Sequence, residues 1–347
     1  MARFSLKPFS LWLAALACLP LGSLANAEPI QWVTVGDPGN TADTAPAGYG
    51  AVATSFQIMK YELTNQQYTD FLNSVDSSGT NPYSVYNTSM GSNARGGITN
   101  TGSTNGSRYA VKTNMGDKPV SYVSWFDAAR VSNWLMNGGT NSSSTETGAY
   151  TLVGGQTTGT APAVNSGATF SVPTEDQWYK AAYYKGGGTN AGYWNYATQS
   201  DSAPTAVTAG ETGIGSAGST GNFANYNSTA DWNSQDGYVT TVGTNGGPSF
   251  YGAFDMGGNV EEWNDLTGAS GSSRGRRGGD WYFDAFILSS SYSYSFDPSR
   301  ANDGGVGFRL ASPVASGVPE IDPSGLSAVL GLLAGGLGLL ERRRYGR

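Results

Sequence analysis

Two motifs near the C-terminal end of the chain decide its fold: DMGGNVEEW at Asp255–Trp263 and RGGDW at Arg277–Trp281. Each motif contains a pair of adjacent glycines, which reach backbone conformations that other residues rarely adopt. A tryptophan ends each motif, and we expect side chains of this size in the core rather than against a ligand. The two motifs therefore predict a tightly turning backbone built around buried aromatic residues.

Upstream of these motifs, three segments have the apolar spacing of short helices: 64–75, 124–136 and 174–184. In the first, Phe71 and Leu72 lie on one face behind Thr64, a residue type that caps helices. The third begins at Thr174, with Gln177 three residues later, which is the spacing of a capping box. Helices are therefore predicted to be few and short.

Three further segments are rich in Gly, Ser, Thr and Asn, and we expect them to be surface loops: 75–107, 137–168 and 199–222. Downstream of the two motifs, the chain reads GFRL at Gly307–Leu310. A buried charge needs a partner, so Arg309 is expected to pair with an internal carboxylate. The whole pattern predicts a loop-rich domain with short strands.

The composition excludes several classes of function. The 347 residues carry a net charge of −7, and 13% of them are charged whereas 12% are aromatic. Nucleic-acid binding depends on Lys and Arg that neutralise phosphates, so an acidic chain disfavours that partner. The chain has no histidine, and its one cysteine, Cys18, lies near the N-terminus. Beyond that residue, cysteine- or histidine-based catalysis and a disulfide framework are excluded.

Residues 1–27 have the organisation of a secretory signal peptide. Arg3 and Lys7 precede an apolar run at 11–21, and Ala25-Asn26-Ala27 supplies small residues for cleavage. An N-terminal membrane helix is the alternative, but it requires a longer apolar run. We therefore expect this segment to be removed and the body of the protein to be exported.

Residues 318–347 have the organisation of a second, C-terminal signal. VPEIDP at Val318–Pro323 precedes a short transmembrane segment, Leu326–Leu340, and the basic cluster Arg342–Arg344. As a helix the apolar segment spans about 22 Å, short of the roughly 30 Å hydrocarbon core. This tail resembles the PEP-CTERM sorting signal of Gram-negative bacteria, which implies removal by an exosortase and delivery to the cell surface or an extracellular polysaccharide matrix. A permanent single-span anchor is the alternative, and it also leaves the body outside the cytoplasm.

Six motifs follow one another along the body of the chain, and their order resembles that of one family. They are Tyr61–Asn65 (YELTN), Pro119–Trp125 (PVSYVSW), Val172–Glu175 (VPTE), Asp255–Trp263, Arg277–Trp281 and Gly307–Leu310. The series is similar to the formylglycine-generating enzyme, or sulfatase-modifying factor, family over nearly all of residues 28–313. The resemblance implies a single α+β domain related to C-type lectins, with little regular secondary structure, a few short helices and β-hairpins.

The family's catalytic positions hold other residues in this chain. In the enzymes of the family, the segment after the Arg-Gly-Gly motif carries two cysteines, five residues apart, that bind copper and perform the oxidation. Phe283 and Leu288 occupy these positions here, and neither side chain can form a thiolate or ligate copper. Another branch of the family binds iron through histidines, which this chain lacks. The resemblance therefore implies the fold without the copper or the iron chemistry.

The remaining acidic and hydroxyl residues give little support to a hydrolase. Paired carboxylates hydrolyse glycosides when they face each other across a cleft, roughly 5–10 Å apart. Glu261 and Glu262 are neighbours on a predicted strand, so their side chains point to opposite faces. Ser289–Ser291 supply hydroxyls without a histidine base, and we expect them to be ordinary surface serines.

Oxygen-bearing residues match the positions at which the family holds two structural calcium ions. The first set is Asn225 and Asp236 by side chain, with the carbonyls of Tyr226 and Tyr238. The second set is Asp255 and Glu262 by side chain, with the carbonyls of Gly258 and Val260. The alternative is that these acids cap turns or pair with arginines such as Arg309.

Three functions remain open for the exported body. The first is a non-catalytic surface or matrix binding protein that holds a glycan, peptide or protein, because aromatic rings beside Asn and Ser suit weakly charged ligands. The second is an enzyme, either of the sulfatase-modifying type or with a new activity in the same groove. The third is a purely structural surface component. If a ligand binds, the resemblance places it around Asp280, Trp281, Tyr282 and Arg300.

Overall fold

The structure is a computed structural model that describes residues 29–45, 48–103 and 107–314. The helices are α1 (Asn65–Val75), α2 (Ser89–Ser92), α3 (Trp125–Met136) and α4 (Glu175–Tyr183). The strands are β1 (Trp32–Val35), β2 (Phe56–Met59), β3 (Ile98–Asn100), β4 (Tyr109–Val111), β5 (Thr205–Ala206), β6 (Phe223–Ala224), β7 (Glu261–Asn264), β8 (Arg274–Arg277), β9 (Tyr294–Phe296), β10 (Val306–Gly307) and β11 (Ala311–Pro313). Across these three ranges, no helix is long and apolar enough to cross a membrane. The predicted signal peptide, residues 1–27, and the sorting tail, residues 318–347, lie outside the described residues.

The three predicted helices are confirmed, with ends that agree to within one residue. Helices α1, α3 and α4 follow Thr64, Ser124 and Thr174, whose hydroxyls accept a hydrogen bond from the backbone N–H three residues later. The side chain of that third residue accepts a hydrogen bond from the backbone N–H of the capping residue, which completes a capping box in each helix. The sequence thus determines locally where each helix begins.

The strands form small sheets rather than one continuous layer. Strands β1, β2 and β11 form a sheet in the order β1-β2-β11, and a second sheet has the order β10-β7-β8-β9. In the second sheet β7 is parallel to β10 and antiparallel to β8, and β9 is the last strand beyond β8. This mixture of short helices and small sheets confirms the predicted single α+β domain with little regular structure.

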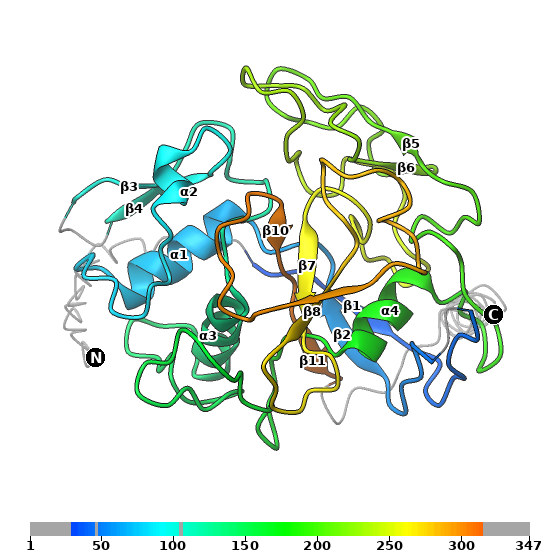
Figure 1. Ribbon diagram of the computed structural model, residues 1–347, viewed down its shortest axis with the longest axis horizontal. Coiled ribbons are helices and arrows are strands. Elements are labelled where there is room, and N and C mark those ends of the chain that lie inside the picture. The colour runs from blue at the N-terminus through cyan, green and yellow to red at the C-terminus, as the bar shows by residue number, and fades with distance from the viewer. Residues whose placement is uncertain (1–28, 46–47, 104–106, 315–347) are drawn as a thin grey trace, which may run out of the picture.

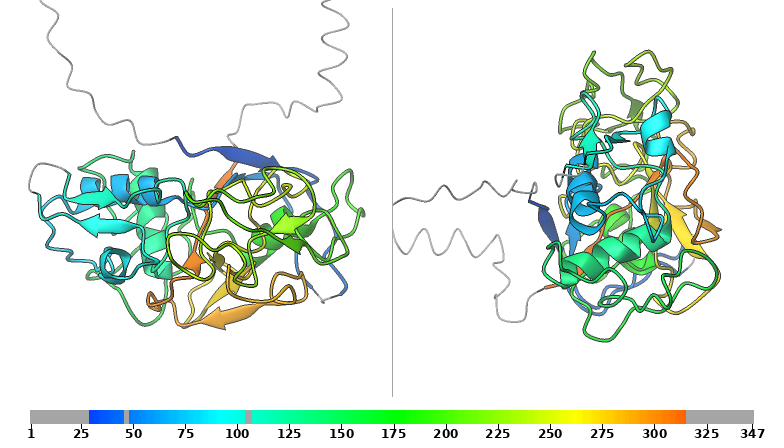
Figure 2. Two further views of the ribbon diagram at one scale, coloured as in Figure 1. Left: turned by 90° about the horizontal axis from the view of Figure 1, so that it is seen from above. Right: turned by 90° about the vertical axis from the view of Figure 1, so that its left-hand side faces the viewer.

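Figure 1 shows strands β7 and β8 in the middle of the molecule, with α1 and α3 on one side and α4 on the other. The largest group of buried apolar side chains includes Trp125 of α3 and Trp263 of β7. A second group surrounds Trp178 of α4. Figure 2 shows the dark-blue β1 and the light-orange β9 on opposite faces of the molecule. The central sheet is therefore covered by helices on its sides, while β9 reaches the surface.

Three expectations about burial and loops need correction. Trp263 is fully buried as predicted, but Trp281 is only partly buried, because it follows the end of β8 where the chain returns to the surface. Ser289 and Ser290 are buried rather than exposed, and Ser290 N–H donates to the carbonyl of Asn195. The segment 75–107 also contains α2 and β3, so it is not a simple loop.

Candidate functional site

Phe283 and Leu288, the two positions that the resemblance aligns with catalytic cysteines, lie in different surroundings. Leu288 is 1% exposed, whereas Phe283 is 38% exposed. A methyl group on Gly279 would lie 3.0 Å from Leu288 Cδ1, so the glycine allows the leucine to pack closely against the backbone. One position is thus part of the core, and the other presents an aromatic ring to solvent.

Strand β7 directs its two glutamates into different surroundings, as predicted from their adjacency. On the inner side, both carboxylate oxygens of Glu262 accept hydrogen bonds from Arg309, at 2.6–2.9 Å. Trp178 Nε1 donates to the same carboxylate at 2.8 Å. The expected pairing of Arg309 with an internal carboxylate is confirmed, and it joins the last strands to the centre of the fold.

On the outer side, Glu261 faces Arg276 of β8. The Nη1 atom of Arg276 lies 3.6 Å from Glu261 Oε2 and 3.7 Å from Asp303 Oδ2, and it has no hydrogen-bond partner. The guanidinium lies 3.9 Å from the ring centroid of Trp263 and 4.3 Å from that of Phe296. Burial raises the pKa of Glu261 to about 7 and lowers the pKa of Arg276 to about 10. The Glu261–Arg276 pair therefore leaves more hydrogen-bonding groups without partners than the Glu262–Arg309 pair does.

Asp280 completes a group that we call the outer cluster: Glu261, Arg276, Asp280 and Asp303. Asp280 is 5% exposed, and its Oδ1 accepts hydrogen bonds from the N–H groups of Tyr282, at 2.9 Å, and Phe283, at 3.3 Å. Burial, with the negative charges of Glu261 and Asp303, raises the pKa of Asp280 to about 7. Asp280 thus holds in place the start of the loop that carries the rings of Tyr282 and Phe283.

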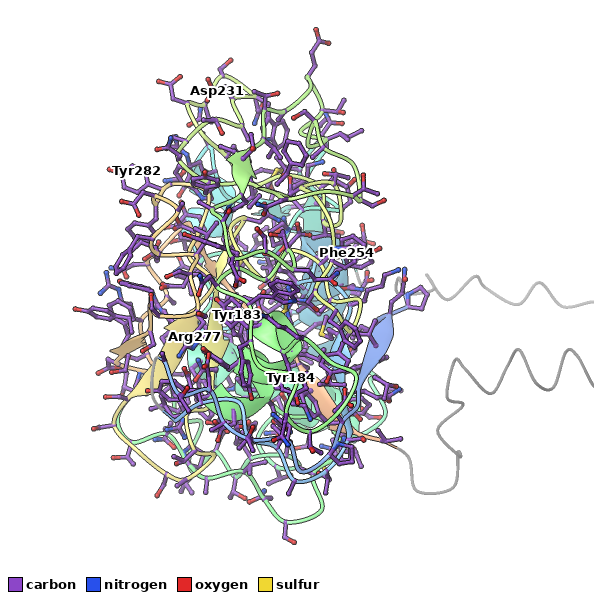
Figure 3. The ribbon with its side chains drawn as sticks, turned by 90° about the vertical axis from the view of Figure 1, so that its right-hand side faces the viewer. Tyr183, Tyr184, Asp231, Phe254, Arg277 and Tyr282 are labelled. Atoms are coloured by element: carbon purple, nitrogen blue, oxygen red, sulfur yellow. The ribbon has the colours of Figure 1, made fainter. Side chains whose placement is uncertain are left out.

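The other residues predicted around a ligand lie at the surface next to this cluster. Trp281 is partly buried, and the guanidinium carbon of Arg95 lies 4.7 Å from its ring centroid. Tyr282 is 63% exposed, and Figure 3 shows it at the side of the molecule away from β1. Arg300 is exposed, and its carbonyl oxygen lies 3.4 Å from Arg276 Nη2. We call Asp280, Trp281, Tyr282 and Arg300 the ligand surface.

An open depression of ≈ 590 Å³ adjoins this surface, lined by Asn87 and by residues 299–302. Its wall is held by a hydrogen bond of 2.6 Å from Asn87 Nδ2 to the carbonyl of Ala301. Arg300 therefore stands between the outer cluster and a concave region large enough for part of a small ligand.

Several residues of this site were not predicted. Arg95 comes from a segment that was expected to be a plain loop, and it reaches Trp281 while donating to the carbonyl of Asp236 at 2.8 Å. Nothing in the sequence pattern links these distant positions. Arg276 could have been found, because the RGRR sequence of β8 places a second basic side chain opposite β7.

The first predicted calcium set fits an oxygen-bound cation in part. Asn225 is fully buried; its Nδ2 donates to the carbonyl of Tyr238 at 2.8 Å, while its Oδ1 is buried without a hydrogen-bond partner. An unpartnered amide oxygen is costly in the interior, and it is a ligand that calcium accepts. Asp236 is exposed on the same segment as Tyr238, and the carbonyl of Tyr226 accepts a hydrogen bond from Thr229.

The second predicted set, which lies at the turn into β7, is Asp255, Gly258, Val260 and Glu262. Its two carboxylates are already bonded: Glu262 to Arg309, and Asp255 to the N–H of Gly243 and to Asn245 Nδ2, at 2.6 and 2.9 Å. Because Arg309 supplies the positive charge, this set does not fit a calcium ion as it is arranged. Within the described ranges, no three Asp, Glu, Cys or His side chains converge as a metal site.

Taken together, these groups can bind a ligand through rings, carboxylates and guanidinium groups. Asp280 and Glu261, each with a pKa raised to about 7, change charge near neutral pH. The sequence supplies no cysteine or histidine after Cys18 to act as a nucleophile, a base or a ligand for a redox metal.

Comparisons with known proteins identify the family to which the chain belongs. A search of curated proteins found no similar sequence. Among solved structures, a Treponema denticola variable protein 1 has a TM-score of 0.48 and 20% identity, over 82% of this chain and 95% of that chain. The structure of CarF has a TM-score of 0.47 and 21% identity, over 82% of this chain and 99% of that chain. The structure of PvdO from Pseudomonas aeruginosa has a TM-score of 0.40 and 18% identity, over 82% of this chain and 92% of that chain. The family model for the sulfatase-modifying factor enzyme 1-like domain matches residues 25–314, and the chain belongs to that family.

Proposed function

We propose that this chain is a non-catalytic binding protein that holds an extracellular ligand on the ligand surface defined above. The observation that carries this proposal is the filling of the two cysteine positions. Leu288 is packed into the core, and Phe283 adds an exposed ring next to Tyr282, with the ring centroids 5.7 Å apart. In the alignment that the resemblance implies, a core leucine and an exposed phenylalanine stand where the related enzymes have a metal-binding cysteine pair.

The chemistry of the ligand surface suits a polar, weakly charged ligand such as a glycan or a peptide. The rings of Trp281 and Tyr282 offer flat apolar area, whereas Arg300 and the partly exposed Asp303 offer hydrogen bonds. Charges of both signs are present here, and Asp303 lies 3.7 Å from Arg276 of the outer cluster, so the surface does not favour a strongly anionic or strongly cationic ligand. Nucleic acid is accordingly not among the proposed partners.

We further propose that the protein acts outside the cell. The signal-like residues 1–27 and the tail at 318–347 support export, processing by an exosortase-type enzyme and retention at the cell surface or in an extracellular polysaccharide matrix. Intact-mass measurement of the protein recovered from the native cell surface tests both cleavages. A mass equal to that of the whole chain would contradict processing at either end.

A calcium ion at the first predicted set is part of the proposal, as a structural and not a catalytic group. Asn225 and Asp236 would bind it by side chain and the carbonyls of Tyr226 and Tyr238 would add two more oxygens, and the unpartnered Asn225 Oδ1 supports this choice. At a calcium concentration one hundred times Kd, such a site adds about 2.7 kcal/mol to stability. Thermal unfolding with and without a chelator measures this contribution. Asp236→Asn should abolish the response to chelator, and an unchanged response would contradict the site.

Binding is tested with the purified secreted protein on glycan and peptide arrays, followed by titration of any ligand found. Trp281→Ala should weaken binding at least about tenfold, as expected for an aromatic side chain at the centre of an interface. Phe250→Ala is the matched control, because it removes a ring that is 46% exposed outside the ligand surface. Equal affinity of both variants and the wild type would contradict the placement of the ligand.

An enzyme of the sulfatase-modifying type is the alternative function, and it is tested separately. Elemental analysis of the native protein should find no stoichiometric copper or iron, because Phe283 and Leu288 cannot bind copper and the chain has no histidine to bind iron. A sulfatase peptide that contains the target cysteine should remain unmodified after incubation with the protein. Formylglycine in that peptide, with a bound redox metal, would overturn the proposal.

A further inference from the structure

Strand β9 has one edge that no strand of the described chain covers. In the sheet order β10-β7-β8-β9 it is the last strand, and it pairs only with β8, in antiparallel register. An open strand edge displays unpaired backbone N–H and C=O groups to any other strand that approaches. Figure 2 shows β9 on the outer face of the molecule, on the side opposite β1.

The sequence around β9 lacks the features that normally protect an open edge. Residues 285–296 read AFILSSSYSYSF and contain no charged residue, no proline and no glycine. Natural sheets discourage edge pairing with lysines, prolines or bulges at such positions. The flanking charges, Asp284 and Asp297, stand just outside this stretch. The uncharged run therefore leaves the edge open to pairing.

Four aromatic rings line this edge in what we call the aromatic strip: Phe286 and Tyr294, which are exposed, and Tyr292 and Phe296, which are partly buried. Phe286 and Tyr294 are 61% and 52% exposed, which is unusual for large rings. Neighbouring ring centroids in the strip are 5.9, 6.4 and 4.6 Å apart, from Phe286 to Phe296. Arg276 and Arg300 lie against the last ring, at 4.3 and 4.7 Å from its centroid. The four rings thus form a continuous strip, and the two arginines hold the ring of Phe296 at its end.

We propose that the aromatic strip is a self-association surface, at which β9 pairs antiparallel with β9 of a second copy of this chain. Two copies that each carry a net charge of −7 repel each other, and the uncharged strip lets them approach without opposing like charges. Alternate residues of an extended segment share a face, so a two-fold axis at Tyr294 places Tyr294 opposite its own copy and brings Tyr292, which lies two residues before β9, opposite Phe296. This register pairs every ring of the strand with another ring, and such cross-strand pairs are stabilising.

The contact is small, so we expect a weak and concentration-dependent dimer rather than an obligate one. Pairing joins two four-stranded sheets into one and brings two ligand surfaces to the same side of the dimer. A multivalent ligand such as a repeating polymer would then bind both surfaces and gain affinity without any new contact. The self-association itself does not depend on the proposed function, because the strip lies beside the ligand surface and not within it.

Sedimentation velocity of the purified protein over a range of concentrations tests the dimer. The wild type should shift from monomer to dimer, and Tyr294→Lys should raise the concentration of half-dimerisation at least tenfold, because it puts like charges opposite each other. Tyr294→Phe should retain the dimer, and Phe250→Lys is the matched control at an exposed ring elsewhere. All variants should melt at the wild-type temperature, because the altered rings are exposed. A wild type that stays monomeric, or a Tyr294→Lys variant that dimerises equally well, would overturn the proposal.

A chemical cross-link tests the register. Cys18 is the only cysteine of the chain and lies in the predicted signal peptide, so Tyr294→Cys provides the only thiol of the processed protein. At the two-fold axis the two thiols come within the range of a disulfide. Mild oxidation with diamide should yield covalent dimers of this variant at least tenfold faster than of Phe250→Cys. Equal rates in the two variants would show that the β9 edges do not meet in this register.

Discussion

Glu261 and Glu262 are neighbours on β7, yet their carboxylates meet different surroundings. Glu262 is fully buried and bonded through both oxygens to Arg309 and Trp178. Glu261 stands 3.6 Å from an arginine that lacks hydrogen bonds at two of its nitrogens. The first arrangement is complete and leaves nothing for a ligand to change. The second is incomplete and lies next to exposed rings, and burial raises the pKa of its carboxyl group to about 7.

The largest effect is expected on the inner side of β7. Glu262→Gln removes the charge that compensates Arg309, and breaking one partner of a buried ion pair costs about 3–5 kcal/mol. Urea-induced unfolding followed by tryptophan fluorescence measures this loss. Glu262→Gln combined with Arg309→Met should recover part of the stability, because the second change removes the unpaired cation. A loss below about 1 kcal/mol for the single variant would contradict a structural role for this pair.

A smaller, pH-dependent effect is expected at Asp280. Because burial raises its pKa to about 7 in the folded protein, from the ordinary value of 3.8, the folded state binds a proton more tightly than the unfolded state. Asp280 therefore lowers the unfolding free energy as pH rises from about 4 to about 7. Asp280→Asn keeps the acceptor oxygen for the N–H groups of Tyr282 and Phe283 but cannot ionise.

Unfolding free energies at pH 5 and pH 8 check this prediction. Relative to the wild type, Asp280→Asn should gain stability between these pH values, by on the order of 2 kcal/mol. Asp297→Asn is a control at an exposed carboxylate, whose pKa is lowered by hydrogen bonds from Ser299. The same pH dependence in the wild type and in Asp280→Asn would show that Asp280 does not titrate in this range.

The smallest effect on stability is expected at Glu261. Its ion pair with Arg276 is long, and burial already disfavours the charged carboxylate, so Glu261→Gln should change the unfolding free energy by about 1 kcal/mol or less at pH 7. The same unfolding assay, run beside Glu262→Gln, compares the two neighbours directly. Equal losses for the two variants would remove the distinction between the inner and outer sides of β7.

The fold was largely predictable because its signals are local. Thr64, Ser124 and Thr174 cap the helices with side chains only three residues away, and the alternation on β7 separates its two glutamates. The outer cluster was only partly predictable, because residues 261, 276, 280 and 303 meet through the β7–β8 register and a loop far along the chain. The partial exposure of Trp281 could not be predicted either, because its motif has the same pair of adjacent glycines and the same final tryptophan as the motif that ends at the buried Trp263. Burial depends on where the chain leaves the sheet, and the sequence pattern does not carry that information.

The three-stranded sheet β1-β2-β11 has a practical consequence for handling the protein. Both ends of the described chain leave from this sheet, since β1 and β11 flank the same strand, β2. Figure 3 shows Tyr282 at the side of the molecule opposite β1. A fluorescent label, a bead or a sensor chip attached at either end would therefore sit behind the domain. Protein immobilised through its N-terminal end and protein immobilised through its C-terminal end should therefore give the same ligand-binding curve.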